Sequence, residues 1–343
     1  MKKIRIGLVG FSQGYYATKY TSYLAEFKNV ELVGCCDLGE KEEYVRQCAF
    51  TTAKEFCEKL DAKLYHNFAD LLEEGLDGVL VCSETADHAD HIIQAMKGGA
   101  HVFVSKPLSF LSTDVKKVME EQQRLRKLVL CGQPLRYEQG MIDIANAIKT
   151  GAVGKVTNVR VMLNHEAMVH VDWERNSYRS GGPLGTFGVY LFDIPLMLCG
   201  LKVVGLSALG ETLVHSVLED YDTFQIVARL ENGALANLNL VSTVNWESPF
   251  VRVDIVGTDG IISGEYDNYT YRVVGKKNPA FGSLRTTDMG EAEAKHFLEC
   301  LRGECEPCIS LADMHYSALA IEAARESAGI SSYVKLKDSG FDS

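Results

Sequence analysis

Short apolar runs alternate with helix-length segments through the first third of the chain. The runs are rich in Ile, Leu and Val, and they span Lys3–Gly10, Val30–Cys36, Gly78–Cys82 and His101–Val104. A helix-length segment, 15–27, follows the first run. Strands that alternate with helices predict a parallel sheet covered by helices on both faces. Ligands of such sheets bind beyond the carboxyl ends of the strands, so the residues after each run are candidates for a site.

The pattern changes after about residue 150. Several stretches there contain β-branched residues, and in these stretches apolar residues either alternate with polar ones or follow one another without interruption. These predicted strands are 155–163, 223–230, 234–241, 250–256 and 269–274. Asn232-Gly233 lies between two of them and Asp259-Gly260 follows another, and such dipeptides favour tight hairpins. We therefore expect an antiparallel sheet here. Apolar residues at helical spacing predict a last helix over 311–328 that stops at Gly329.

Together these patterns predict two domains. Residues 1–130 are expected to form an α/β domain of the Rossmann type, which binds nucleotides. Residues 131–343 are expected to form an α+β domain with a large, mostly antiparallel open sheet. A chain of 343 residues, 46% hydrophobic, is long enough for two cores.

Charge and cysteine content narrow the function classes. Lys and Arg number 35 against 46 Asp and Glu, a net charge of −11, which argues against nucleic acid or an anionic membrane as partner. No apolar stretch approaches the roughly 20 residues of a membrane span. The first strand begins at once, which leaves no room for a signal peptide. Ten cysteines without export imply reduced thiols, so we expect a cytoplasmic protein.

The turn after the first strand is a candidate for binding a pyrophosphate. Its residues are Gly10, Phe11, Ser12 and Gln13. Backbone N–H groups and the start of a helix at such a turn favour an anion. The fingerprint G-x-G-x-x-G is incomplete, because Ser12 and Tyr15 occupy two of its glycine positions.

Asp37 ends the second strand. A carboxylate there can accept hydrogen bonds from both ribose hydroxyls of NAD and would repel a 2′-phosphate. No arginine follows closely, since the next residues are Leu38, Gly39 and Glu40. We therefore expect NAD rather than NADP as the cofactor.

Lys106 is the strongest single candidate for a catalytic residue. It follows the fourth strand and precedes Pro107. Proline fixes its own φ and pushes the residue before it toward extended geometry. The backbone of this lysine is therefore expected to be held where the strand stops, beside the cofactor. The alternative is a solvated surface lysine.

Several motifs, taken in order, resemble the Gfo/Idh/MocA family of NAD(P)-dependent oxidoreductases over most of the chain. The family's Glu-Lys-Pro stands here as Ser105-Lys106-Pro107, and its Thr-Pro-Asn-x-x-His loop as 83–88, ending at His88. Its Gly-x-(Asn/His)-x-Arg strand stands as 132–136, and the stretch 148–156 fits the family's entry into its large sheet. The resemblance implies hydride transfer to or from sugars, cyclitols or their derivatives.

The same resemblance implies further site residues. It places His88 near the cofactor, together with Ser83 and Thr85 of its loop, and Gln133 near the nicotinamide. It places substrate contacts near Arg136 and Asp193. It also implies a homodimer or homotetramer, because the family usually covers the outer face of the open sheet with another subunit.

The family's catalytic pattern, Asp-x-Gly-x-His-x-x-Asp, is altered here. Thr186 stands for the aspartate and Tyr190 for the histidine. Tyrosine at this position resembles the branch that contains glucose–fructose oxidoreductase, where it is taken as the acid/base. An ordinary tyrosine pKa of about 10 is too high for a base at neutral pH, but a nearby ammonium lowers it. The hypothesis is Tyr190 as acid/base with Lys106 as its electrostatic partner.

The polar and aromatic stretch 165–173 comes just before this segment. His165 and Trp173 could line a sugar pocket, with the indole stacked on an apolar sugar face. An ordinary surface loop is the alternative. His165 is the next candidate base if Tyr190 proves inert.

No metal site is expected from the sequence. Cys305 and Cys308 form a single C-x-x-C with Cys300 upstream, and zinc sites normally need a second pair or suitably spaced histidines. His88 and His91 share a helix face, but the resemblance places His88 by the cofactor.

Three functions remain open. The first is an NAD(H)-dependent dehydrogenase that acts on a carbohydrate and releases its cofactor. The second is an enzyme that keeps NAD bound and oxidises a sugar transiently. The third is a non-catalytic regulator that binds a dinucleotide.

Overall fold

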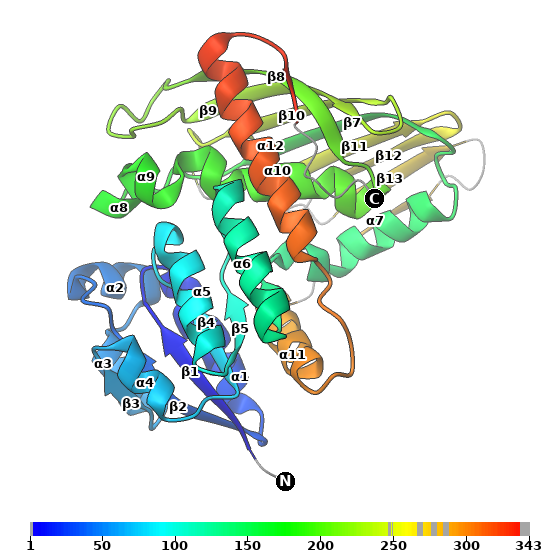
Figure 1. Cartoon of the computed structure of the whole chain (residues 1–343). Helices are drawn as coiled ribbons and strands as arrows, with labels where there is room; N and C mark the ends of the chain where they lie inside the picture. Colours follow the sequence, from blue (N-terminus) through cyan, green and yellow to red (C-terminus); the bar gives the residue numbers. More distant parts are fainter. Residues whose placement is uncertain are drawn as a thin grey trace. The chain divides into compact units, whose positions relative to one another are not determined.

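The computed structural model describes residues 3–245, 248, 250–265, 270–275, 280–283 and 288–336. The chain forms two compact units, each with its own sheet (Figure 1). Unit 1 comprises 1–109, 113–134 and 288–314, and unit 2 comprises 110–112, 135–287 and 315–343. The chain passes from unit 1 to unit 2 after residue 134, which is close to the expected domain boundary at residue 130. The segment 288–314 was expected in the second domain, but it packs with the first.

Unit 1 contains the expected parallel Rossmann sheet. Its strand order is β3-β2-β1-β4-β5-β6, and all neighbouring strands are parallel. The strands are β1 Ile4–Val9, β2 Val30–Cys36, β3 Lys63–Tyr65, β4 Gly78–Val81, β5 His101–Val104 and β6 Val129–Cys131. The sequence pattern missed β3 and β6, because each has only three residues and gives no clear apolar run.

Helices surround this sheet, and one of them comes from far along the chain. They are α1 Gly14–Glu26, α2 Glu42–Ala49, α3 Ala53–Lys59, α4 Phe68–Glu73, α5 His88–Lys97, α6 Ser112–Leu125 and α11 Met289–Leu301, with a 3₁₀ turn at Thr85–Asp87. α11 packs against α1. It inserts Phe297 into the core, where its ring centroid lies 5.4 Å from that of Phe103.

Unit 2 contains a nine-stranded sheet with the order β14-β13-β12-β11-β7-β10-β9-β8-β15. All neighbouring pairs are antiparallel except β7 and β10, which confirms a mostly antiparallel sheet. The strands are β7 Val156–Asn164, β8 Val203–Glu211, β9 Thr223–Leu230, β10 Leu235–Val241, β11 Val251–Gly257, β12 Gly260–Glu265, β13 Thr270–Gly275, β14 Ala280–Ser283 and β15 Val334–Lys335. Tyr269, the first residue of one expected strand, lies outside the described residues.

Unit 2 also contains several helices. They are α7 Gln139–Lys149, α8 Asp172–Arg175, α9 Ser177–Ser180, α10 Gly182–Cys199 and α12 Leu311–Ile330, with a 3₁₀ turn at Pro134–Tyr137. α10 contacts β7, β10 and α7. The expectation that the last helix stops at Gly329 was wrong: α12 continues to Ile330, and Ser331 ends it with a left-handed φ of 52°.

One helical stretch, Ser177–Cys199, is long and apolar enough to cross a membrane by length and composition, with a mean hydropathy of 1.3. This corrects the expectation that no apolar stretch approaches that length. Within the described residues, 78% of the relevant window is buried inside the protein. The stretch contains α10, whose contacts with the sheet account for its apolar composition.

Phe297→Ala tests whether α11 is part of the first core. Phe297 is fully buried, so its truncation is expected to lower the free energy of unfolding of unit 1 by about 3–5 kcal/mol in urea titrations. Phe50→Ala is the control, because Phe50 is 92% exposed and its truncation should change the value by no more than about 0.5 kcal/mol. Equal effects of the two changes would contradict this packing.

Candidate active site

The carboxyl edge of the parallel sheet gathers the residues predicted to bind the cofactor. They follow β1 (Gly10, Phe11, Ser12 and Gln13), β2 (Asp37), β4 (Ser83, Thr85 and His88), β5 (Lys106) and β6 (Gln133). Parallel strands place all these loops at one edge, which is where ligands bind in open α/β sheets. Thr85 and Gln13 also meet directly, since the Gln13 amide donates to the Thr85 hydroxyl at 3.3 Å.

Gly10 allows the first turn to approach the loop after β4. Its φ is +81°, and a Cβ at this position would lie 2.5 Å from the Cα of Ser83. The Gly10 N–H donates to the Cys36 carbonyl and the Gln13 N–H to the Cys82 carbonyl, both at 2.9 Å. Any side chain at residue 10 would therefore separate the turn from its neighbouring loop.

Glu40 is a site residue that the sequence analysis missed. Its carboxylate accepts from the Phe11 N–H at 2.6 Å and from the Ser12 hydroxyl at 3.3 Å. Burial, and next the neighbouring Asp37, raise the pKa of Glu40. The Phe11 N–H is thus a donor that can hold an oxygen ligand, as a turn that binds a pyrophosphate requires. Glu40 could have been found from its position, three residues after Asp37 in the same loop.

Asp37 and Glu40 place two carboxyl groups next to the end of β2. One oxygen of Asp37 accepts from the Gly39 N–H at 2.9 Å, and the Leu38 N–H donates to Glu40 at 2.8 Å. These backbone bonds fix both side chains in the loop. Two acidic groups here favour ribose hydroxyls as ligands and oppose a 2′-phosphate.

His88 joins two of the loops at the sheet edge. Its Nδ1 lies 2.9 Å from the Pro107 carbonyl oxygen and its Nε2 lies 2.9 Å from the Ser83 carbonyl oxygen. Burial lowers the pKa of His88 to about 4, although the two carbonyl groups favour the cation. Both ring nitrogens face the protein, so His88 positions the loops that carry Ser83 and Lys106.

Lys106 lies at the end of β5, as predicted, and its peptide bond to Pro107 is cis. The side chain is only 8% exposed. Burial lowers the pKa of the Lys106 ammonium to about 7. Lysine is rarely buried to this degree outside functional sites, and a pKa near neutrality suits proton transfer. This excludes the alternative of a solvated surface lysine.

Glu293 is a second residue that the sequence did not indicate. It lies on α11 and is fully buried, and its carboxyl group accepts from the Gln133 N–H and the Tyr20 hydroxyl, both at 2.5 Å. Burial raises the pKa of Glu293 to about 8. Charged residues surround Glu293 in the sequence, as on an ordinary solvated helix face. The sequence therefore carried no sign that this side chain is buried.

Unit 2 contains an aromatic cluster around Tyr190. The Tyr190 ring meets Phe250 edge-on, with centroids 5.6 Å apart. His165 stacks on Phe187 at 4.1 Å and meets the edge of Phe250 at 5.7 Å. The two candidate bases, His165 and Tyr190, are thus brought to one cluster.

Arg136 and Asp193 bind each other. The Arg136 Nε lies 2.9 Å from one oxygen of Asp193, and Nη2 lies 2.5 Å from the other. Their side chains are 13% and 2% exposed, so this is a buried, bidentate ion pair.

Thr186 lies one turn before Tyr190 on α10, on the same helix face. Trp173 lies on α8, and its Nε1 is buried without a hydrogen-bond partner among the described residues.

Two family models match the chain. Residues 4–133 match the model described as an oxidoreductase family with an NAD-binding Rossmann fold. Residues 141–263 match the model described as the GFO/IDH/MocA C-terminal domain. The first unit is therefore an NAD-binding Rossmann domain.

Known proteins resemble the chain over nearly its whole length. A myo-inositol 2-dehydrogenase of Thermotoga maritima is 26% identical and covers 98% of this chain and 99% of its own. A scyllo-inositol 2-dehydrogenase (NAD(+)) of Bacillus subtilis is 24% identical, over 90% and 89%. The crystal structure of an aldose–aldose oxidoreductase from Caulobacter crescentus has the same fold, with a TM-score of 0.80, 21% identity and coverage of 98% of this chain and 100% of its own.

Glu293→Gln is expected to change how stability depends on pH. The pKa of Glu293 rises on folding from its ordinary 4.5 to about 8, so its contribution is full below pH 4.5 and is lost as pH rises through 8. Glutamine cannot titrate. Between pH 5 and 9 the melting temperature of the wild type should therefore fall relative to the variant, by at least roughly 2–4 °C.

Glu291→Gln on the same helix is the control, since that side chain is exposed. It should leave the pH dependence of the melting temperature unchanged. Parallel curves for the wild type and Glu293→Gln would refute the assigned pKa.

Proposed function

We propose that this chain, which belongs to the Gfo/Idh/MocA family of oxidoreductases, transfers a hydride between NAD and a secondary alcohol or ketone of a sugar, cyclitol or glycoside. Two of its full-length relatives are inositol 2-dehydrogenases, which supports a polyhydroxylated substrate. The acidic pair at the end of β2 supports NAD rather than NADP.

The buried Lys106 carries this proposal. An ammonium with a pKa near 7 at the carboxyl edge of an NAD-binding sheet can donate a hydrogen bond to the reacting oxygen. It can also hold the negative charge that develops there when the hydroxyl loses its proton. A regulator that only binds a dinucleotide would not need a costly buried lysine at this position.

Tyr190 is the proposed acid/base. In the direction of oxidation, its phenolate oxygen takes the proton of the substrate hydroxyl. The sequence predicts Lys106 as the electrostatic partner of this tyrosine, since an ammonium favours the phenolate form. The edge-on contact with Phe250 holds the Tyr190 ring in one orientation. His165 stacks on Phe187 in the same cluster and is the reserve candidate for the base.

NAD, when bound, accepts the hydride at its nicotinamide ring. The residues proposed to hold it are Gly10, Phe11, Ser12, Gln13, Asp37, Ser83, Thr85, Lys106 and Gln133. The bond from the Phe11 N–H to the Glu40 carboxyl group supports an oxygen ligand at this turn, and a bound pyrophosphate would take the place of Glu40 there. His88 positions the loops and is not proposed to touch the cofactor.

The proposed substrate contacts lie in unit 2. They are Arg136, His165, Trp173, Thr186 and Asp193. The Arg136–Asp193 pair supplies fixed donors and acceptors of the kind that hydroxyl groups bind. The buried Nε1 of Trp173 is a donor suited to a sugar oxygen.

We propose further that the protein acts in the cytoplasm as a homodimer or homotetramer. None of the nine cysteines whose side chains are described is joined in a disulfide, which fits a reducing compartment. On the sheet of unit 2, Leu209, Val227 and Leu235 are 46–68% exposed, which fits a face covered by a second copy.

The decisive test is NADH absorbance at 340 nm with purified protein, NAD and a panel of inositols, free sugars and glycosides. We expect one substrate class to reduce NAD. Tyr190→Phe should lower kcat by about 10²–10⁴ and Lys106→Met by about 10²–10³.

Tyr178→Phe and Lys97→Met are the matched controls, because both side chains are exposed. They should leave kcat unchanged. Full turnover in Lys106→Met would refute the proposed mechanism. NAD that copurifies with the protein and never yields free NADH would replace the proposal with an enzyme that keeps its cofactor bound.

A further inference from the structure

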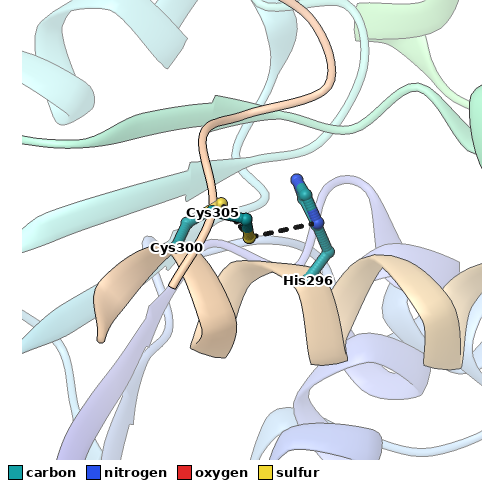
Figure 2. A group of neighbouring side chains, drawn as sticks. All are labelled: His296, Cys300 and Cys305. Carbon is teal, nitrogen blue, oxygen red and sulfur yellow. Dashed lines mark hydrogen bonds between the residues drawn. The ribbon is translucent and has the colours of Figure 1, made fainter. Parts of the chain in front are cut away.

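A cluster of one histidine and two cysteines lies at the end of α11, in unit 1 (Figure 2). His296 and Cys300 are one turn apart on the helix, and Cys305 returns to them from the following loop. The Sγ atoms of Cys300 and Cys305 are 3.5 Å apart, and the Cys305 Sγ is 3.7 Å from the His296 Nδ1. The donor atoms of all three residues lie within 4.8 Å of one another.

These separations are close to the edges of a zinc tetrahedron. Zinc binds thiolate sulfur at about 2.3 Å and imidazole nitrogen at about 2.0–2.1 Å. At tetrahedral angles these bonds place two sulfurs about 3.7 Å apart, and a sulfur and a nitrogen about 3.5 Å apart. The observed values of 3.5 and 3.7 Å differ from these by only about 0.2 Å. Two of the three edges therefore fit a zinc ion, and the third, between His296 and Cys300, is within 4.8 Å.

Cys308 is the candidate for a fourth donor. Its sulfur lies outside the group of donor atoms that are within 4.8 Å of one another, so the loop must bring it closer on binding. Cys308 follows Cys305 in a C-x-x-C, the spacing that loops of zinc sites use, and it lies near enough to Cys300 to act on it electrostatically. His296 and Cys300 are spaced i, i+4 on the helix, so their side chains share a face. The whole set reads His-x₃-Cys-x₄-Cys-x₂-Cys.

We propose that His296, Cys300, Cys305 and Cys308 bind one zinc ion in a structural site. Three thiolates and one imidazole are soft and borderline ligands that favour zinc over magnesium or calcium. Four protein ligands leave no open position, so the site is closed to substrate. Binding releases the thiol protons and involves no oxidation or reduction. A second cysteine pair or a suitably spaced histidine was not expected near the C-x-x-C, but His296 lies four residues before Cys300.

A redox or nucleophilic role for these thiols is less well supported. Reactive cysteines have lowered pKa values and exposed sulfur atoms. Cys300 is buried, and burial raises the pKa of its thiol to about 12. Such a thiol is inert unless a metal displaces its proton.

The ion would secure α11 to the rest of unit 1. Cys300 belongs to the core cluster together with Phe297, and Cys305 packs against that cluster. Zinc would join the last turn of α11 to the loop that follows it, and so restrict the helix that carries Glu293. This role concerns stability and is independent of the proposed reaction.

The test is the metal content of the full-length protein, purified under reducing conditions without chelators and measured by plasma mass spectrometry. We expect about one zinc per chain. Cys305→Ser and Cys308→Ser should each lose most of it. Cys199→Ser, a half-buried cysteine in unit 2, is the matched control and should retain it.

Two measurements on the wild type do not depend on the variants folding. Removal of zinc by a chelator under reducing conditions should lower the melting temperature of unit 1. Addition of Co²⁺ to the stripped protein should give the visible bands of tetrahedral cobalt bound to thiolates. Protein that holds no zinc and gives no such bands would overturn the proposal. So would a Cys300–Cys305 disulfide, seen as a mass loss of about 2 Da.

Discussion

The buried carboxyl group of Glu293 joins three segments that lie far apart in the sequence. It accepts from the backbone after β6 and from Tyr20 on α1, while its own backbone belongs to α11. An unpaired carboxyl group at this depth would be costly, so these bonds fix how α11 sits against the sheet. That placement also brings Phe297 into the core and Gln133 to the carboxyl edge, where the cofactor residues gather.

Much of the fold follows from local pattern. The sequence predicted strands β1, β2, β4 and β5 from their apolar runs, and a hairpin at Asn232-Gly233. These predictions succeeded because hydrophobic periodicity and turn residues are local properties of the sequence. The three-residue strands β3 and β6 were not predicted, since they exist only by pairing with longer neighbours. The return of α11 to the first unit was also invisible, because it depends on tertiary contacts and not on the composition of the helix.

Some residues of the candidate site could likewise be predicted from the sequence, and others could not. Lys106 and Asp37 were found because the ends of parallel strands can be located from sequence. Glu40 and Glu293 were missed because a carboxylate on a charged loop or helix gives no sign of being buried. The pairing of Arg136 with Asp193 could not be foreseen, since residues 57 positions apart meet only in the folded unit. His296 was overlooked because the loop that carries Cys305 must fold back onto α11 before the cluster exists.

The path of the chain has a consequence for synthesis. Unit 1 opens the sequence, but its last helix, α11, is translated after most of unit 2. A nascent chain that has reached residue 134 has all six parallel strands but lacks Phe297 and Glu293, so the pocket around Tyr20 and Phe103 stays uncovered. The usual order, in which an N-terminal domain folds first and independently, cannot be completed here. Unit 1 is therefore finished only after most of unit 2 has been made.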